Sequence, residues 1–119
     1  MLKGKAALVT GSTSGIGLAI AEALAREGAS VMLNGLSDAD AIESTRAELE
    51  QRTGSKVRFS GANLMDAEAC AKLVEDTADS FGSLDIVVNN AGMQHVAPVD
   101  EFPVDKWNAI ISLNLSAAF

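Results

Sequence analysis

Short apolar runs alternate along the chain with longer stretches in which apolar residues recur every three or four positions. Four runs have the length and composition of buried strands: Ala6–Thr10, Ser30–Asn34, Lys56–Ser60 and Leu84–Val88. The stretches between them have the period of amphipathic helices. A chain that alternates strand and helix so regularly needs right-handed crossovers and forms a parallel sheet. The pattern therefore predicts an α/β fold with a doubly wound parallel sheet.

The first two predicted helices differ in how apolar they are. The first, Ile16–Glu27, has apolar residues spaced by three or four: Ile16, Ile20, Ala23 and Leu24. The second begins near the cap-like segment Ser37–Asp40 and runs to Arg52. Its apolar stripe is thin and consists of Ile42 and Leu49. We expect both helices to lie on the sheet.

The third predicted helix has the clearest amphipathic pattern. Asp66 can cap it, and its apolar face consists of Cys70, Leu73, Val74, Thr77, Ala78 and Phe81. Glycines follow the first three helices, where a helix C-terminus favours glycine: Gly28, Gly54 and Gly82. A last helix is expected from about Val104, with Trp107 and Ile111 in core or subunit packing.

Composition and charge narrow the range of functions. The 119 residues are 48% hydrophobic and 21% charged, which is typical of a globular domain or part of one. The net charge of −7, without a basic cluster, argues against nucleic acid or an anionic membrane as partner. Cys70 is the only cysteine, so no internal disulfide can form. The N-terminal apolar run is too short for a membrane span, and we expect a cytoplasmic protein without a metal site.

Three glycines lie between the first strand and the first helix. Gly11, Gly15 and Gly17 occupy the point where backbone N–H groups have no helical partner and suit phosphate oxygens. A side chain at position 11 or 15 would keep a diphosphate away from these amides, and Gly17 would let the helix approach the sheet. Ordinary turn glycines are the alternative. Their place after a strand and before a helix favours a nucleotide site.

Three motifs in their order along the chain resemble the short-chain dehydrogenase/reductase family. They are TGSTSGIG (Thr10–Gly17), NNAG (Asn89–Gly92) and NLS (Asn114–Ser116). The resemblance implies a Rossmann-like doubly wound sheet with strand order 3-2-1-4. It also implies hydride transfer between NAD or NADP and an alcohol or carbonyl carbon.

The resemblance carries a set of cofactor-binding residues to this chain. They are Gly11, Thr13, Ser14, Gly15, Ile16, Gly17, Leu36, Asn63, Leu64, Asn90, Ala91, Gly92 and Leu113. It also implies that Asn89 ties neighbouring strands together. Family members usually have Asp where this chain has Asn63, whose carbonyl can still accept a hydrogen bond from the adenine, beside which Leu64 would pack.

The residues around the predicted adenosine site favour NAD over NADP. A 2′-phosphate needs a cation, and no Lys or Arg occurs between Glu27 and Arg46. Ser14 also stands where NADP-dependent relatives often have a basic residue. Gly35 occupies the place where an acid usually receives the ribose hydroxyls, so backbone groups and Leu36 would have to serve there.

Within the family, three segments resemble the bacterial D-3-hydroxybutyrate dehydrogenases: LNG, NNAGMQH and DEFPVDKWNAIISLNLSAAF. The resemblance implies interconversion of (R)-3-hydroxybutyrate and acetoacetate, with the Gln94 amide donating to the substrate carboxylate, and a homo-oligomer. His95 is more simply a local hydrogen-bonding or surface residue than a substrate ligand. A 3-oxoacyl-carrier-protein reductase and a non-catalytic nucleotide-binding module are the alternatives.

The catalytic set that the family implies is incomplete in this chain. The family uses a tyrosine, a lysine, a serine and an asparagine; only the asparagine, Asn114, has a counterpart, and the chain contains no tyrosine. We therefore expect the N-terminal part of a single dinucleotide-binding domain, truncated and inactive alone. Its fourth strand would lie at an edge and favour self-association or capture of the missing half.

Overall fold

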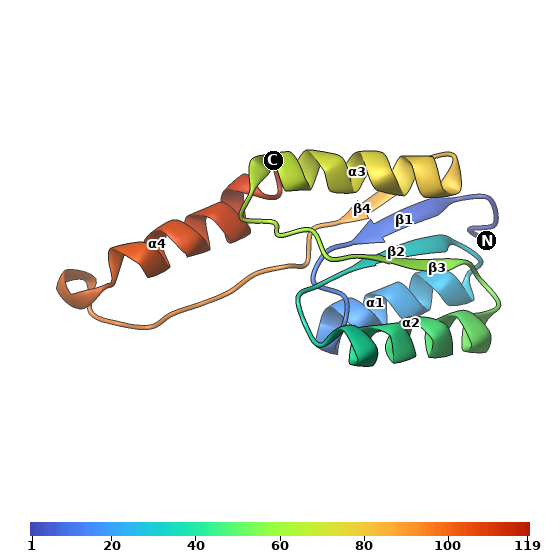
Figure 1. Cartoon of the computed structure of the whole chain (residues 1–119), viewed down its shortest axis with the longest axis horizontal. Helices are drawn as coiled ribbons and strands as arrows, with labels where there is room; N and C mark the ends of the chain where they lie inside the picture. Colours follow the sequence, from blue (N-terminus) through green and yellow to red (C-terminus); the bar gives the residue numbers. More distant parts are fainter.

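The computed structural model describes residues 1–119 and has the predicted alternation of strands and helices (Figure 1). The strands are β1 (Ala6–Val9), β2 (Ser30–Asn34), β3 (Val57–Ser60) and β4 (Ile86–Val88). The α-helices are α1 (Gly15–Arg26), α2 (Ala39–Thr53), α3 (Ala67–Phe81) and α4 (Val104–Ile111). A 3₁₀ turn, η1 (Val99–Glu101), precedes α4, and a π-helical segment, η2 (Ser112–Ser116), continues it.

The four strands form one parallel sheet in the order β3-β2-β1-β4, which confirms the predicted order 3-2-1-4. Helices α1 and α2 cover one face and α3 covers the other, so the sheet is the middle layer of three (Figure 1). The predicted strands at 56 and 84 begin one and two residues later than expected. The carboxyl ends of all four strands lie at one edge, where ligands bind in such sheets.

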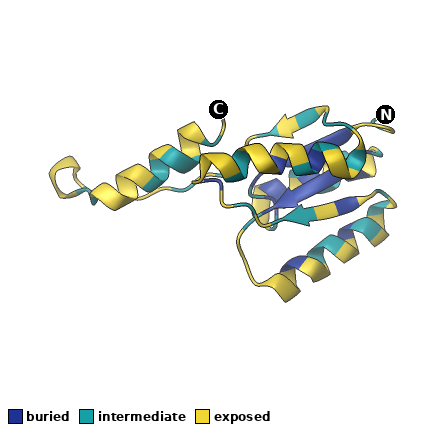
Figure 2. Cartoon of the chain, turned by 45° about the horizontal axis from the view of Figure 1, so that its top comes forward, coloured by how far each residue is buried: buried dark blue, intermediate teal, exposed yellow.

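Both faces of the central strands β1 and β2 are buried, and alternate residues of these two strands supply the two cores (Figure 2). Ala7, Val9, Val31 and Leu33 point to α1 and α2, whereas Leu8 and Met32 point to α3. Because successive side chains of a strand point to opposite faces, a strand buried on both sides reads as a continuous apolar run. This explains the unbroken apolar sequences of β1 and β2.

Helix α1 lies on the sheet with its small residues. The predicted face is confirmed only in part: Ile20 and Leu24 pack against the core, but Ile16 is 76% exposed, and the buried residues are Gly17, Ala21 and Ala25. Small side chains let the helix axis approach the sheet closely, while Ile20 and Leu24 pack along the sides of the core. The predicted stripe of α2 is confirmed, because Ile42 and Leu49 are buried.

Carboxylate caps begin α2 and α3. Asp38 accepts a hydrogen bond from the N–H of Ala41, and Asp66 accepts one from Glu68, as the sequence predicts. Gly54 and Gly82 end these helices in the left-handed conformation with φ of 73° and 81°. Such positions favour glycine because a side chain is strained there.

Helix α4 extends away from the three layers and gives the chain a length of 50 Å (Figures 1 and 2). Trp107 is 59% exposed and no residue of α4 is buried. The expectation of core packing for Trp107 and Ile111 is therefore wrong within this chain, because the helix has no sheet face beneath it. Subunit packing remains a prediction.

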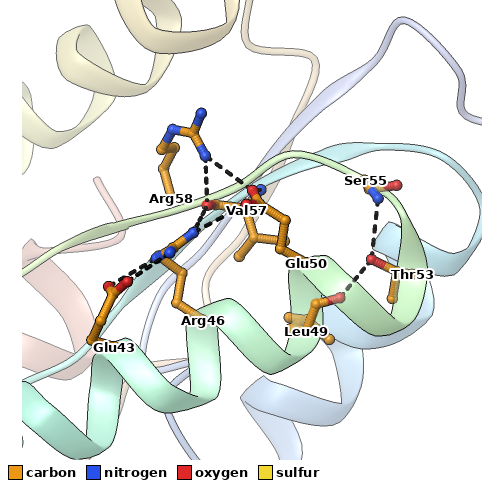
Figure 3. A network of polar contacts seen from close by, with 8 residues as sticks. All are labelled: Glu43, Arg46, Leu49, Glu50, Thr53, Ser55, Val57 and Arg58. Carbon is orange, nitrogen blue, oxygen red and sulfur yellow. Dashed lines mark hydrogen bonds and ion pairs between the residues drawn. The ribbon is translucent and has the colours of Figure 1, made fainter.

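The two edges of the sheet differ in how their backbone groups are satisfied. At the β3 edge, Val31 donates its N–H to Lys56, so the N–H and C=O of Val57 point away from β2. Side chains occupy both groups (Figure 3): Glu50 accepts from the Val57 N–H at 2.8 Å, and Arg46 and Arg58 each donate to its C=O at 3.0 Å. No side chain satisfies the free edge of β4 in this way. Self-association through β4 stays a prediction.

Glu50 is the centre of the network on the β3 edge. Its carboxylate also pairs with Arg58 at 3.0 Å and Arg46 at 3.4 Å. The Val57 N–H first, and then the two guanidinium groups, hold the pKa of Glu50 below its ordinary value. Ionised Glu50 therefore stabilises the folded chain above the unfolded-state pKa of about 4.3, and this stabilisation is lost as the pH falls through the lowered value.

We predict that Glu50→Gln lowers the midpoint of thermal unfolding at pH 7 and that the difference from the wild type shrinks below about pH 4. The amide oxygen can still accept from Val57, but the charge that attracts the two arginines is lost. Calorimetry across pH 3–7 measures this. Glu48→Gln is the matched control, since Glu48 is an exposed residue of the same helix without an ion pair. Parallel curves for Glu50→Gln and the wild type would contradict the prediction.

Candidate functional site

The loop between β1 and α1 contains two left-handed glycines. Gly11 has φ of 59° and Gly15 has φ of 58°. A Cβ at Gly11 would lie 2.9 Å from the Cα of Ala91, so this glycine allows the loop to approach the segment after β4. A Cβ at Gly15 would meet nothing within 4 Å and would project into open space. The open side of the loop is therefore at Gly15, which agrees with a ligand-facing position.

The first turn of α1 has free backbone donors. The first hydrogen bond of the helix joins the N–H of Leu18 to the C=O of Ser14, and Ser14 makes no side-chain cap. The N–H groups of Gly15, Ile16 and Gly17 therefore have no acceptor within the chain. No acidic residue lies in this turn, in contrast to α2 and α3. Free amides and an uncompensated helix dipole suit an anion such as a diphosphate.

Gly17 allows the closest contact in the loop. A Cβ there would overlap the carbonyl oxygen of Gly11 and would lie 2.5 Å from Nδ2 of Asn90. Gly17 therefore permits close packing, but its neighbours are the loop and Asn90 rather than the sheet that the sequence predicts. Any larger residue would have to displace the Gly11 backbone.

Asn90 joins the end of β4 to the glycine loop. Its Nδ2 donates to the carbonyls of Thr10 at 3.1 Å and Gly11 at 3.0 Å. The Thr10 hydroxyl accepts from the N–H groups of Asn90 and Ala91, both at 3.0 Å. The tying role expected for Asn89 therefore belongs to Asn90: Asn89 is exposed, and its side chain makes no hydrogen bond.

Asn34 performs the same task on the other side of β1 and was missed by sequence reasoning. It is 1% exposed at the end of β2. Its Oδ1 accepts from the N–H of Gly11 at 3.2 Å, and its Nδ2 donates to the carbonyls of Ser60 and Ala62 at 3.2 and 3.1 Å. A polar residue at the end of an apolar strand was the available signal.

A cleft of about 270 Å³ opens at this edge of the sheet. It is lined by Gly11, Asn34, Gly35, Leu36, Ala62, Asn63, Leu64, Met65, Asn90, Ala91, Gly92 and Leu113. Eight predicted cofactor residues are among them: Gly11, Leu36, Asn63, Leu64, Asn90, Ala91, Gly92 and Leu113. The other five predicted cofactor residues lie on the glycine loop and the first turn of α1: Thr13, Ser14, Gly15, Ile16 and Gly17. The glycine loop therefore connects these five residues to those that line the cleft.

The part of the cleft after β2 carries no cation. None of its lining residues is Lys or Arg. Gly35 packs against Thr13: a Cβ at position 35 would overlap the Thr13 hydroxyl oxygen and lie 2.8 Å from its methyl carbon. An acidic side chain at Gly35 would therefore require Thr13 to move. Leu36, 66% exposed, presents an apolar surface beside it.

Asn63 and Leu64 both make contacts within the chain, Asn63 through a hydrogen bond and Leu64 through packing in the core. Oδ1 of Asn63 accepts from the N–H of Met65 at 3.1 Å, which leaves one lone pair of the carbonyl for a ligand. Leu64 is 8% exposed and packs against Leu8, Met32 and Leu73. Its side chain mainly builds the core, and only part of it lines the cleft.

Asn114 and Gln94 lie beyond the cleft, on the segments that follow β4. Asn114, in η2, accepts from the N–H of Met93 and donates to the C=O of Met93, both at 2.9 Å. This π-helical turn is the kind of irregularity often found at functional sites. Gln94 is exposed and has no hydrogen-bond partner within the chain.

No three His, Cys, Asp or Glu side chains are grouped so as to hold a metal ion. None of the helices combines the length and hydrophobicity needed to span a bilayer.

The parallel sheet with strand order 3-2-1-4 and the glycine loop after its first strand define a Rossmann-like α/β protein. The chain belongs to the short chain dehydrogenase family, whose sequence model matches residues 5–119. It is 50% identical over 119 residues to D-beta-hydroxybutyrate dehydrogenase of Cupriavidus necator, and 44% identical over 115 residues to that of Rhizobium meliloti. These alignments cover 100% and 97% of this chain and 45% of each relative, so the chain spans about half the length of the curated relatives it matches.

Solved structures agree with this assignment. A putative short-chain alcohol dehydrogenase from Sinorhizobium meliloti has a TM-score of 0.91 and 41% identity, covering 99% of this chain and 46% of that one. A short chain dehydrogenase from Burkholderia cenocepacia in complex with NADP has a TM-score of 0.91 and 37% identity, covering 98% and 47%. The chain is thus truncated relative to these proteins, and the predicted family and fold are confirmed.

We predict that Asn90→Asp destabilises the chain by about 2 kcal/mol, because an acceptor replaces the donor that faces two carbonyls. Urea unfolding measures the loss. Asn89→Asp is the matched control, with the same change of charge on the neighbouring residue, and should leave the free energy of unfolding within about 0.5 kcal/mol of wild type. Equal effects of the two substitutions would show that Asn90 does not hold the loop.

Proposed function

We propose that the polypeptide containing this chain is an NAD-dependent dehydrogenase that interconverts (R)-3-hydroxybutyrate and acetoacetate. Residues 1–119 form the N-terminal part of its single dinucleotide-binding domain and supply the cofactor-binding half of the site. The observation that carries the proposal is the set of free amides in the first turn of α1, beside a cleft without cations. The proposed substrate is supported by the two curated relatives reported above, both of which are named D-beta-hydroxybutyrate dehydrogenase.

The residues present fit a dinucleotide. The N–H groups of Gly15, Ile16 and Gly17 are free to donate to a diphosphate, and Gly15 leaves room for it. Thr13 and Ser14 precede this turn and would lie beside the same group. Leu36, Asn63 and Leu64 would bound the adenosine, and Asn90, Ala91 and Gly92 would pass the ribose. Leu113 would lie near the nicotinamide.

The absence of a cation supports NAD as the cofactor. A 2′-phosphate is a dianion, and its desolvation in the cleft would require a partner such as Arg or Lys. Neither Gly35 nor Leu36 can supply that charge. The neighbour from Burkholderia cenocepacia is in complex with NADP, so the fold alone does not exclude that cofactor, and the argument for NAD depends on the residues after β2.

The reaction divides between what a bound cofactor supplies and what the chain supplies. A bound nicotinamide would supply the acceptor for the hydride that leaves the carbinol carbon of the substrate. Gln94 donates its amide N–H groups to the substrate carboxylate and orients the carbinol carbon. Asn114 holds Met93 next to Gln94, and the family resemblance makes Asn114 part of the catalytic set.

Proton transfer from the substrate hydroxyl needs a base of tuned pKa. The chain contains no tyrosine, which is the residue the family uses. We therefore expect residues 1–119 to hold cofactor without turnover, as a nucleotide-binding fragment. A 3-oxoacyl-carrier-protein reductase is the second enzymatic candidate, and its usual NADPH disfavours it at a cleft without cations.

The direct experiment measures NADH formation by the full-length polypeptide with (R)-3-hydroxybutyrate and NAD. We expect turnover with this enantiomer, at least tenfold less with NADP, and none from residues 1–119 alone. The (S) enantiomer is the control for specific positioning. Turnover of a 3-oxoacyl thioester with NADPH, without turnover of 3-hydroxybutyrate, would overturn the proposal in favour of the second candidate.

We predict that Leu36→Arg shifts the cofactor preference toward NADP. The guanidinium would supply the missing partner for the 2′-phosphate, and a charge-assisted hydrogen bond would tighten NADP binding about tenfold. Titration calorimetry with both cofactors measures the two dissociation constants. Leu36→Gln is the matched uncharged control and should not tighten NADP binding. An unchanged ratio of the two constants in Leu36→Arg would place the 2′ position elsewhere.

A further inference from the structure

The connection from β4 to α4 is long and exposed, yet it is anchored at both neighbours of Gln94. Gln94 has no hydrogen bond within the chain, whereas Met93 before it and His95 after it each contact a residue far along the connection or beyond it. A side chain that is free between two fixed neighbours is well placed to bind a ligand. The anchors therefore decide where Gln94 projects.

The anchor before Gln94 is the pair of hydrogen bonds between Met93 and Asn114. Both groups of the Asn114 amide are used, the oxygen by the Met93 N–H and the nitrogen by the Met93 C=O. Because Asn114 lies in the π-helical segment η2, this pair fixes Met93 relative to the end of α4.

The anchor after Gln94 consists of three aromatic rings, His95, Phe102 and Trp107, which we call the aromatic stack. The rings of His95 and Phe102 meet edge to face with centroids 5.3 Å apart and an interplanar angle of 85°. Phe102 and Trp107 meet in the same way at 6.4 Å and 88°. Trp107 belongs to α4, and its backbone N–H donates to the C=O of Pro103 at 3.0 Å. The stack thus joins the loop at His95 to the first turns of α4.

We propose that His95 is a positioning residue, which holds Gln94 in its substrate-binding orientation through the aromatic stack. This inference rests on the proposed function, in which Gln94 donates to the carboxylate of a short hydroxy acid. It assigns a role to His95 that needs no contact with substrate. It also accounts for the contact between Phe102 and the exposed Trp107, which belong to neither core of the sheet.

Preorganisation is the physical reason for the arrangement. An exposed glutamine on an unanchored loop would lose backbone and side-chain freedom when it binds a carboxylate, and that entropy cost would weaken binding. With Met93 and His95 fixed, only the Gln94 side chain remains to be ordered. Removal of the His95 ring should therefore weaken substrate binding while leaving the cofactor cleft intact, because the stack lies outside the lining of that cleft.

The experiment uses steady-state kinetics of the full-length polypeptide with 3-hydroxybutyrate and saturating NAD. Gln94→Ala removes the donor to the carboxylate and should raise KM roughly tenfold. His95→Ala should raise KM about three- to tenfold with kcat within twofold and the NAD dissociation constant unchanged. His95→Phe preserves the ring contact and should restore a KM near the wild-type value. Val96→Ala is the control within the loop, since Val96 is 88% exposed, and should leave KM unchanged.

The double variant Gln94→Ala/His95→Ala separates a positioning role from an independent one. If His95 acts through Gln94, the second substitution should add less than twofold to the KM of Gln94→Ala. Full multiplication of the two effects, or an unchanged KM in His95→Ala, would overturn the positioning role while leaving the function of Gln94 intact. An unchanged KM in Gln94→Ala would overturn both the carboxylate contact and the role of His95.

Discussion

Two asparagine side chains hold the carboxyl edge of the sheet together, one on each side of β1. Asn34 links Gly11 to the ends of β2 and β3, and Asn90 links the carbonyls of Thr10 and Gly11 to the end of β4. A peptide loop at the end of a buried strand has polar groups that water cannot reach, and each costs free energy unless it is paired. The two side-chain amides satisfy these groups and at the same time fix the path of the loop. The absence of a Cβ at Gly17 then lets α1 begin directly over the loop.

The free amides of α1 follow from the same arrangement. α2 and α3 are capped by their own aspartates, whereas α1 begins with Ser14, which makes no cap. The strand, the loop and the helix are all held in place, so the three unpaired N–H groups are presented in a fixed geometry. Such fixed donors bind an anion without a cost of reorganisation, which is the property a diphosphate site needs. The neighbouring cleft is uncharged, since Gly35 is packed against Thr13 and Leu36 is apolar.

The remainder of the structure shows two edges with different chemistry. Glu50, Arg46 and Arg58 occupy the outward backbone groups of Val57, which opposes addition of a strand beside β3 (Figure 3). The β4 edge has no such protection, and the apolar residues Val87 and Val74 near it are about half exposed. Beyond β4 the chain leaves the sheet, and local pairs instead of a core hold it: Met93 with Asn114, and the three aromatic rings. These contacts fix the two neighbours of Gln94, although the segment has no core of its own.

The sequence by itself determined the order of elements, the parallel sheet and the position of the glycine loop. Strand and helix periods, aspartate caps and glycine stops are local signals, and the family motifs placed eight residues that the structure brings into one cleft. It did not reveal that α1 packs with Gly17, Ala21 and Ala25, that Asn90 rather than Asn89 ties the loop, or that Asn34 joins three strands. Those outcomes depend on which side chain faces which neighbour across segments 20 to 80 residues apart, and only the tertiary structure decides that. Asn89 and Asn90 have identical chemistry, and the one-residue alternation after β4 directs one amide to the loop and the other to solvent.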